Sequence, residues 1–255
     1  MGGRQASAAR ELLTRTLHGG LSEREMVAAA WTVVTELGAP ERLSELIADL
    51  ASGVGAPEGC ALLSYRHILG FDKLLLLDGS PQFMLRAHVW HPGVGAVGKE
   101  DVHNHRSPLG SYIVRGRLVM ELYEAVHEDG NSEDGNSGSG FAADQYVESL
   151  SDGDADWLLE HVGRARLRMT HLGRYAAGSS YALPAHTLHR AWCDTDEPTV
   201  TLFLEAGAQR RLRTDVFTAA GPHPDAVAKD PLDAEGYLAA LNDLTELLRS
   251  SSPDS

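Results

Sequence analysis

Apolar residues in the first fifty-odd positions recur every three or four residues, which is the spacing of amphipathic helices. Ser22 followed three residues later by Glu25 forms a capping box, which predicts a helix start, and Gly38 predicts the end of that helix. A second helix is expected over 41–51, where leucine and isoleucine repeat at helical spacing. We predict that this N-terminal helical segment, 1–56, packs on the outside or near the mouth of a β domain; a lid or a dimer face is the alternative.

From about residue 57 the apolar positions change to the patterns of strands. Leu74–Leu77 predicts a short buried strand, because four leucines in a row are followed by a turn signal. Further strands are expected over 83–90, 117–125 and 198–205. This pattern predicts a mainly β domain that spans 57–220.

The stretch from 127 to 156 contains nine acidic residues and no lysine or arginine. Within it, Glu128–Ser132 repeats at once as Glu133–Ser137. We predict an acidic flexible insert over 127–156, because the repeated run lacks apolar residues to bury. A calcium-binding loop is the rival, although the ligand spacing of an EF-hand is absent. The last part, 221–255, is predicted to be a helical tail whose helix ends near Leu248.

The composition narrows the class of protein and its surroundings. A formal net charge of −14 argues against nucleic-acid binding, which needs clustered lysine and arginine. No apolar run approaches the roughly 20 residues that cross a membrane, and no signal-peptide pattern stands at the N-terminus. The two cysteines, Cys60 and Cys193, do not make a disulfide framework. We therefore expect a cytoplasmic protein without a nucleic-acid or membrane partner.

Two short histidine motifs carry the candidate chemistry. His103 and His105 lie two positions apart in a predicted strand, so their side chains point to one face and can hold one metal ion. Taken alone, the pair fits a polar strand end with two solvated histidines equally well. A second motif, from Gly178 to His189, predicts a strand, a tight turn and a further strand that begins at its histidine.

Together these motifs resemble the two-part signature of the cupin superfamily. The matching residues are His103, His105 and Gly116, then Gly178, Pro184 and His189. The resemblance implies a single cupin (double-stranded β-helix, jelly-roll) barrel with N-terminal helices and a C-terminal helix. It also implies that three of these residues bind the metal, namely His103, His105 and His189. One departure is His186, which stands where cupins usually carry glycine; we interpret it as a residue that supports the ligands from behind or lies at the rim, rather than as a fourth ligand.

The donor set narrows the metal chemistry. Many cupins carry a glutamate four residues after the second histidine of the first motif, and this chain has Leu109 there. Three neutral imidazoles leave a divalent metal with its full charge and at least two open positions, which favours O2 and an anionic substrate at Fe(II). Zinc, nickel or manganese is the alternative, because the same ligands plus water suit an ion that polarises a carbonyl or activates water.

Residues 65–206 resemble cysteine dioxygenase and related thiol dioxygenases, through the segment around Phe83, the histidine motifs and the strand at 198–205. The resemblance implies a three-histidine ferrous centre that uses O2 without an organic cofactor. Lys73 occupies the position at which family members bind the substrate carboxylate through an arginine, and Glu205 occupies the position of their catalytic tyrosine. The resemblance therefore extends to the metal centre and does not extend to the thiol chemistry.

Lys73, Arg86 and Glu205 are the candidate substrate contacts. Arg86 shares a strand face with His88 and Trp90, and the sequence leaves open whether that face looks into the pocket. Lys73 would bind an anion and Glu205 a cation, so we expect a small polar, amino-acid-like substrate with both groups and expect free cysteine to be a poor one. The alternative is that Glu205 pairs with a basic residue such as Arg86 and only holds the barrel together.

The remaining polar residues are interpreted as structural. The histidines without a spacing signal are His67, His91, His161 and His171. Cys193 is read as a small buried hydrophobe, with a position facing the cavity as the alternative. The basic run 208–213 is interpreted as a solvated edge. Gly110 occupies the region where animal thiol dioxygenases carry a cross-linking cysteine.

The leading hypothesis is a non-haem Fe(II)-dependent cupin oxygenase that acts with O2 on a small molecule. One rival is a non-redox isomerase, epimerase or lyase on the same barrel. The other is a non-catalytic binding or sensor module. A homodimer is compatible with all three hypotheses.

Overall fold

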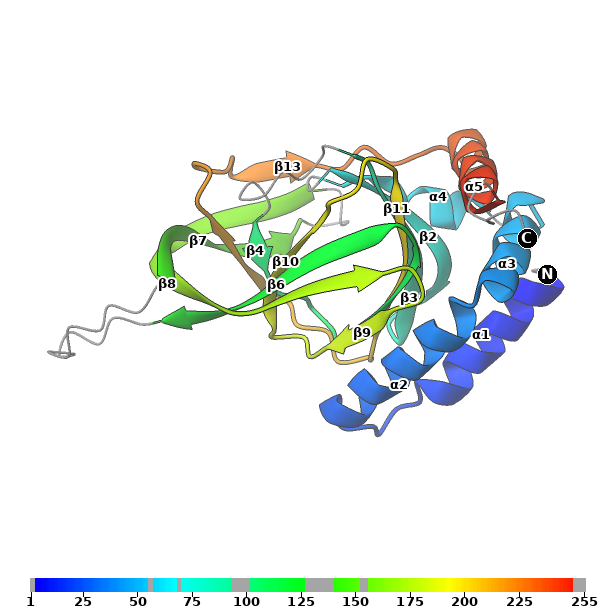
Figure 1. Ribbon diagram of the computed structural model, residues 1–255, viewed down its shortest axis with the longest axis horizontal. Coiled ribbons are helices and arrows are strands. Elements are labelled where there is room, and N and C mark those ends of the chain that lie inside the picture. The colour runs from blue at the N-terminus through cyan, green and yellow to red at the C-terminus, as the bar shows by residue number, and fades with distance from the viewer. Residues whose placement is uncertain are drawn as a thin grey trace, which may run out of the picture.

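The computed structural model describes residues 3–54, 57–67, 70–92, 101–126, 140–151 and 156–249. Its strands form two antiparallel sheets that enclose a barrel, and helices cover one side of that barrel (Figure 1). The prediction of a mainly β barrel with N-terminal and C-terminal helices is therefore confirmed.

The first sheet has six strands in the order β1-β2-β3-β11-β5-β9. Their bounds are β1 Tyr65–Arg66, β2 Phe71–Gly79, β3 Phe83–Trp90, β5 Leu109–Arg115, β9 Ser180–Leu183 and β11 Thr199–Ala206. The strand predicted over 83–90 has these same bounds, and the leucine run 74–77 lies inside β2.

The second sheet has seven strands in the order β13-β8-β6-β10-β4-β12-β7, and β7 also pairs with β8, so this sheet closes on itself. Their bounds are β4 Val102–His103, β6 Arg117–Val126, β7 Gly140–Leu150, β8 Asp156–Ala176, β10 Leu188–Cys193, β12 Thr214–Thr218 and β13 Ala226–Ala228. Two of the three predicted ligands lie on this sheet, because His103 of β4 pairs directly with His189 of β10.

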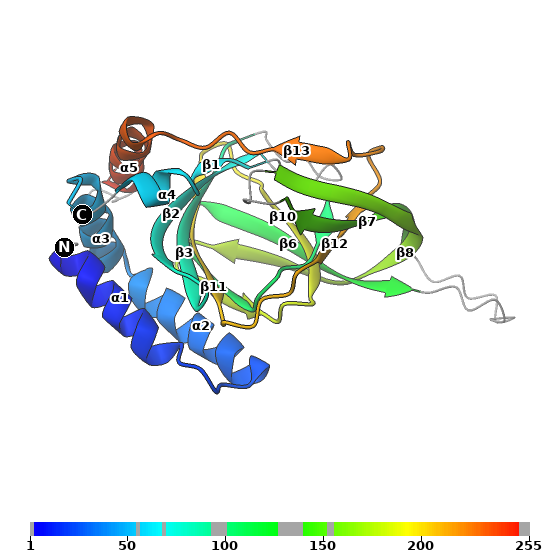
Figure 2. The same cartoon turned by 180° about the vertical axis from the view of Figure 1, so that it is seen from behind.

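The helices pack on the outer face of the six-stranded sheet (Figures 1 and 2). Their bounds are α1 Arg4–Thr16, α2 Glu23–Leu37, α3 Pro40–Ala51, α4 Pro57–Ala61 and α5 Ala234–Arg249. The predicted capping box is present at the start of α2, where Ser22 and Glu25 exchange hydrogen bonds. In the part of the chain that the structure describes, no helix combines the length and the apolar character needed to cross a bilayer.

Two central strands, β3 and β11, are buried along their whole length because the helices cover one face and the barrel interior covers the other. On β11 the side chains of Leu202 and Leu204 join the core that is shared with the helices. Phe203 and Glu205 alternate with them and point into the barrel, where they line its cavity. A polar side chain on the inner face of these strands therefore faces the cavity and not the outer surface of the sheet.

The prediction of a flexible insert over 127–156 is wrong for its second half, because Gly140–Leu150 forms β7. Its residues Ala143 and Tyr146 are buried, and the acidic residues of the same strand, Asp144 and Glu148, hide the strand period in a charge count. Residues 127–139, with the duplicated run, lie outside the described residues. Likewise β13 lies within the segment 221–255 that was predicted to be a helical tail, and it pairs with β8.

Candidate metal centre

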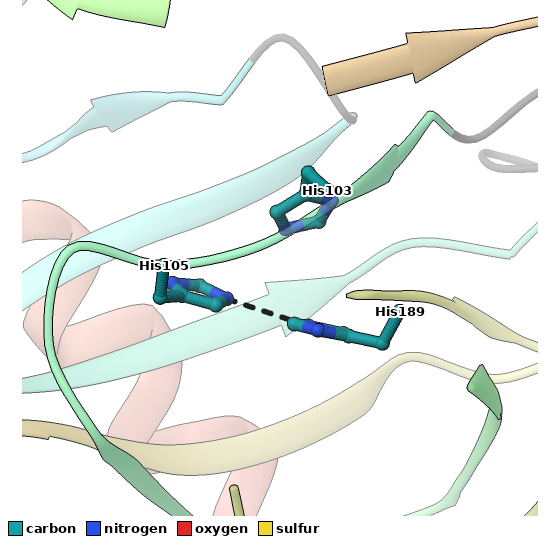
Figure 3. Close-up of side chains that lie close together, drawn as sticks. All are labelled: His103, His105 and His189. Carbon is teal, nitrogen blue, oxygen red and sulfur yellow. Dashed lines mark hydrogen bonds between the residues drawn. The ribbon is translucent and has the colours of Figure 1, made fainter. Parts of the chain in front are cut away.

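Three histidines from separate segments meet inside the barrel (Figure 3). His103 ends β4, His105 follows two residues later outside the strand, and His189 lies on β10. One ring nitrogen from each lies within 4.8 Å of the others. The rings of His105 and His189 are nearly parallel, at 14°, and their Nε2 atoms are 3.3 Å apart. The structure thus brings together the three predicted ligands.

The other ring nitrogen of each histidine faces a hydrogen-bond acceptor. His103 Nδ1 lies 3.1 Å from the carbonyl oxygen of Asp101, and His189 Nδ1 lies 3.2 Å from that of Thr187. His105 Nδ1 lies 3.6 Å from the carboxylate Oε1 of Glu205. A ring whose Nδ1–H points at an acceptor presents the lone pair of Nε2, which is the arrangement of metal-binding histidines.

The separation of the lone pairs of His105 and His189 fits a shared metal ion. Two nitrogens bound at 2.0–2.2 Å with angles between 90° and 109° lie about 2.8–3.6 Å apart, and the observed separation of His105 and His189 Nε2 is 3.3 Å. Burial, together with the neighbouring imidazoles, lowers the pKa of His103 to about 4 and that of His189 well below its usual value. Both rings are therefore neutral at pH 7, as metal ligation requires.

A cavity of about 270 Å³ opens beside the three histidines. Aromatic residues make up much of its wall, namely Phe71, Trp90, Trp157, Tyr181 and Phe203. The three predicted substrate contacts, Lys73, Arg86 and Glu205, also line it, so the face of β3 that carries Arg86 and His88 does look inward. Such a mixture of apolar walls and a few polar groups is typical of small-molecule sites.

Glu205 is the centre of a buried charge cluster. Its Oε2 accepts hydrogen bonds from Arg86 Nη2 at 2.9 Å and from Arg210 Nη2 at 3.2 Å. Burial alone would raise the pKa of Glu205, but Arg86, His105 and Arg210 together hold it well below its usual range. The structure therefore agrees with the alternative that Glu205 pairs with Arg86, and a carboxylate shared by two guanidiniums offers little attraction to a further cation.

Lys73 lies in the same wall and donates a hydrogen bond from Nζ to the hydroxyl oxygen of Tyr65 at 2.7 Å. The two residues are paired across β1 and β2. Burial, with a contribution from Arg86, lowers the pKa of the Lys73 amine well below its usual value. Burial also raises the pKa of the Tyr65 phenol, so both groups favour their neutral forms.

The cavity contains residues that the sequence did not single out. His67, interpreted as structural, stacks on Phe71 with ring centroids 4.5 Å apart and lines the cavity. His223 lies 2.8 Å from the carboxylate of Asp101 and also lines it. Arg210, interpreted as part of a solvated edge, reaches inward to Glu205. No spacing signal marks these residues, because each depends on a contact between segments far apart in the sequence.

Two interpretations of single residues are confirmed. The side chain of His186 is 71% exposed and lies 3.8 Å from Glu23, so it stands apart from the three-histidine cluster. Cys193 is buried in the core between the sheets, with its sulfur 3.2 Å from the hydroxyl of Thr199.

A comparison with known proteins shows that this chain is similar to several solved structures. No protein-family model matches the chain, and no curated protein matches it. A structure of the DMSP lyases RdDddP and RnDddQII is 16% identical over 55% of this chain and 48% of that chain, with a TM-score of 0.31. Hydroquinone 1,2-dioxygenase from Sphingomonas sp. TTNP3 is 10% identical over 53% and 65%, with a TM-score of 0.31. The CENP-C cupin domain of Drosophila melanogaster is 14% identical over 66% and 98%, with a TM-score of 0.33.

The chain therefore spans about half of the lyase structure and 65% of the dioxygenase structure. These likenesses are too distant to carry an argument about function, which depends on the geometry of the three histidines and their cavity.

Proposed function

We propose that this chain is a metal-dependent oxygenase in which His103, His105 and His189 hold Fe(II) and the adjoining cavity binds a small anionic molecule for oxidation with O2. Among the described residues, the metal-ligating cluster consists of imidazoles alone. Such a donor set leaves the charge of the ion undiminished and leaves positions open, which suits binding of an anion beside O2.

The observation that carries the proposal is the contact between the Nε2 atoms of His105 and His189 at 3.3 Å. Each ring turns its Nδ1 to an acceptor, so both Nε2 atoms present lone pairs. Two lone pairs at this distance repel each other unless a cation lies between them. A metal ion relieves that repulsion, and the low pKa of His189 disfavours a shared proton in its place.

Fe(II), when bound to these three histidines, would supply the redox chemistry with O2. The chain's own residues would bind and orient the substrate. Glu205 holds Arg86 in place through Nη2, while Arg86 Nε is buried without a hydrogen-bond partner in the described structure. That spare donor favours Arg86 as the contact for the anionic group, because a buried N–H without a partner is costly. The aromatic wall would exclude water from the reacting molecule.

This assignment modifies the expected substrate. The predicted need for a cationic group relied on an unpaired Glu205, and its carboxylate is shared by Arg86 and Arg210. We therefore propose a small polar anion of amino-acid size, with an ammonium group optional. Lys73 contributes a further polar contact on the β2 side of the cavity.

The test is the metal content of protein purified without added metal, followed by O2 uptake against a panel of small carboxylates, amino acids and thiols. Iron at one per chain with O2 consumption supports the proposal, and the variant His189→Ala should abolish both. Zinc, nickel or manganese without O2 uptake would favour the isomerase or lyase. A folded protein that binds no transition metal would favour the binding module.

A further inference from the structure

The amine of Lys73 is unusual for a lysine because it lies inside the barrel and contacts no carboxylate among the described residues. Only 9% of the residue is exposed. In the part of the chain that the structure describes, its hydrogen-bond partner is the neutral hydroxyl of Tyr65. Glu205, which also lines the cavity, is already held by Arg86 and Arg210. A buried ammonium is normally paired, so this arrangement disfavours the charged form.

Most of the charged groups around Lys73 also disfavour its ammonium form. Arg86 on β3, Arg210 after β11 and Lys229 after β13 are cations that disfavour a further positive charge. Glu205 favours the ammonium, as does the ring of Tyr65, whose centroid is 4.4 Å from Nζ. Burial and the cations prevail, and the pKa of Lys73 falls well below its usual value. A desolvated lysine beside cationic groups is a general form of the activated amine nucleophile.

We propose that Lys73 is a carbonyl-binding residue, which forms an imine with a small aldehyde or 2-oxo acid that enters the cavity, with Tyr65 as the proton donor. The lone pair of Nζ would attack the carbonyl carbon, and one Nζ proton would pass to the carbonyl oxygen to give a neutral carbinolamine. The hydroxyl would then leave as water with a proton from Tyr65, and the remaining Nζ proton would return to the Tyr65 oxygen as the C=N bond forms. The step needs no oxidant or reductant.

The geometry suits this role. Tyr65 Oη lies 2.7 Å from Nζ, so its proton is within reach of an oxygen on a carbon bonded to that nitrogen. The aromatic wall formed by Trp157 and Phe71 limits the access of water that would hydrolyse the imine. The inference concerns Lys73 and Tyr65 alone, so it holds whether or not the three-histidine centre is an oxygenase.

The sequence makes a direct test available, because it contains three lysines, Lys73, Lys99 and Lys229. The intact protein, metal-free and metal-loaded, is incubated at pH 7 with glyoxylate and sodium cyanoborohydride. The reagent transfers hydride to the imine carbon and fixes the adduct as a secondary amine. Peptide mapping by mass spectrometry then gives the rate of modification at each lysine in the same sample.

The expected result is modification of Lys73 at least about ten times faster than of Lys99 or Lys229. A lysine of ordinary pKa is neutral in roughly one molecule in 2,500 at pH 7, so an amine whose pKa lies well below the ordinary value has a large advantage. Equal rates at the three lysines, or no adduct at Lys73, would overturn the proposal.

Two variants test the roles separately. Lys73→Arg should remove the fast adduct and leave the rates at Lys99 and Lys229 unchanged. Tyr65→Phe should slow the reaction at Lys73 several-fold, because the proton donor is lost while the amine stays buried. A rate at Lys73 that is unchanged in Tyr65→Phe would refute the role of the phenol.

Discussion

Breaking the charge cluster around Glu205 should cost far more stability than removing it whole. The side chains of Arg86 and Glu205 are 8% and 9% exposed, so neither charge can be solvated when its partner is lost. Glu205→Leu leaves Arg86 buried and unpaired, which should lower the free energy of unfolding by about 3–5 kcal/mol. Arg86→Met leaves Glu205 with Arg210 at 3.2 Å, so it should cost less, about 1–3 kcal/mol.

The double variant Arg86→Met with Glu205→Leu should cost only about 0–2 kcal/mol, because it leaves Arg210 alone, at 31% exposure, to be solvated. The coupling between the two sites should therefore be at least about 2 kcal/mol. The assay is urea unfolding of metal-free protein at pH 7, because bound metal would add its own stabilisation.

A matched control is the pair Arg168–Glu124, which is closer at 2.6 Å but more than half exposed on both sides. Replacing either partner should change stability by less than about 1 kcal/mol, because solvent screens exposed pairs. Additive effects within about 0.5 kcal/mol at Arg86 and Glu205 would refute the reasoning, since they would mean that the two charges do not depend on each other.

Three further predictions follow from the same structure. Metal analysis of His189→Ala should show loss of most bound metal, whereas the control His186→Ala should keep it, because His186 lies outside the cluster. Burial holds the pKa of His88 well below 6.5, so below that pH the imidazole binds a proton in the unfolded chain and stays neutral in the folded chain. The free energy of unfolding of the metal-free protein, measured with urea, should therefore fall more steeply than that of His88→Phe as the pH drops below about 6.5. The two slopes should differ by up to about 1.4 kcal/mol per pH unit; equal slopes would contradict the burial argument. Gly110→Ala places a Cβ 2.7 Å from the carbonyl oxygen of residue 30 and should cost about 1–3 kcal/mol, whereas Gly59→Ala meets no atom within 4 Å and should be nearly neutral by the same assay.

The metal ligands could be predicted from sequence because their signals are local. His103 and His105 are two residues apart, and the second motif contains its own turn, so spacing alone suggested one face and one site. The inward direction of Arg86 depended on which face of its strand meets the helices. Both faces of β3 are buried, so a hydrophobic pattern could not distinguish them. That is why the sequence left the position of His88 open.

The far side of the cavity could not be predicted, because it is assembled from short segments without a period. Tyr65 belongs to a two-residue strand, and its position opposite Lys73 depends on the pairing of β1 with β2. Trp157 is the second residue of β8 and directly follows the stretch that the acidic composition identified as an insert. Its pairing with Val227 connects this strand to the C-terminal part of the chain. Such contacts follow from tertiary packing and leave no signal in neighbouring residues.

The covering of β11 by helices explains why Glu205 occurs with two arginines. The residue lies on the inner face of a strand whose outer neighbours, Leu204 and Ala206, are packed beneath the helices. An acid placed there cannot turn outward to solvent, so its charge must be compensated within the barrel. At position 205 this chain carries an acid that contacts His105, Arg86 and Arg210 together. Substituting tyrosine at 205 would therefore leave Arg86 without its counter-charge, and the residue at position 86 would have to change with it for the barrel to stay stable.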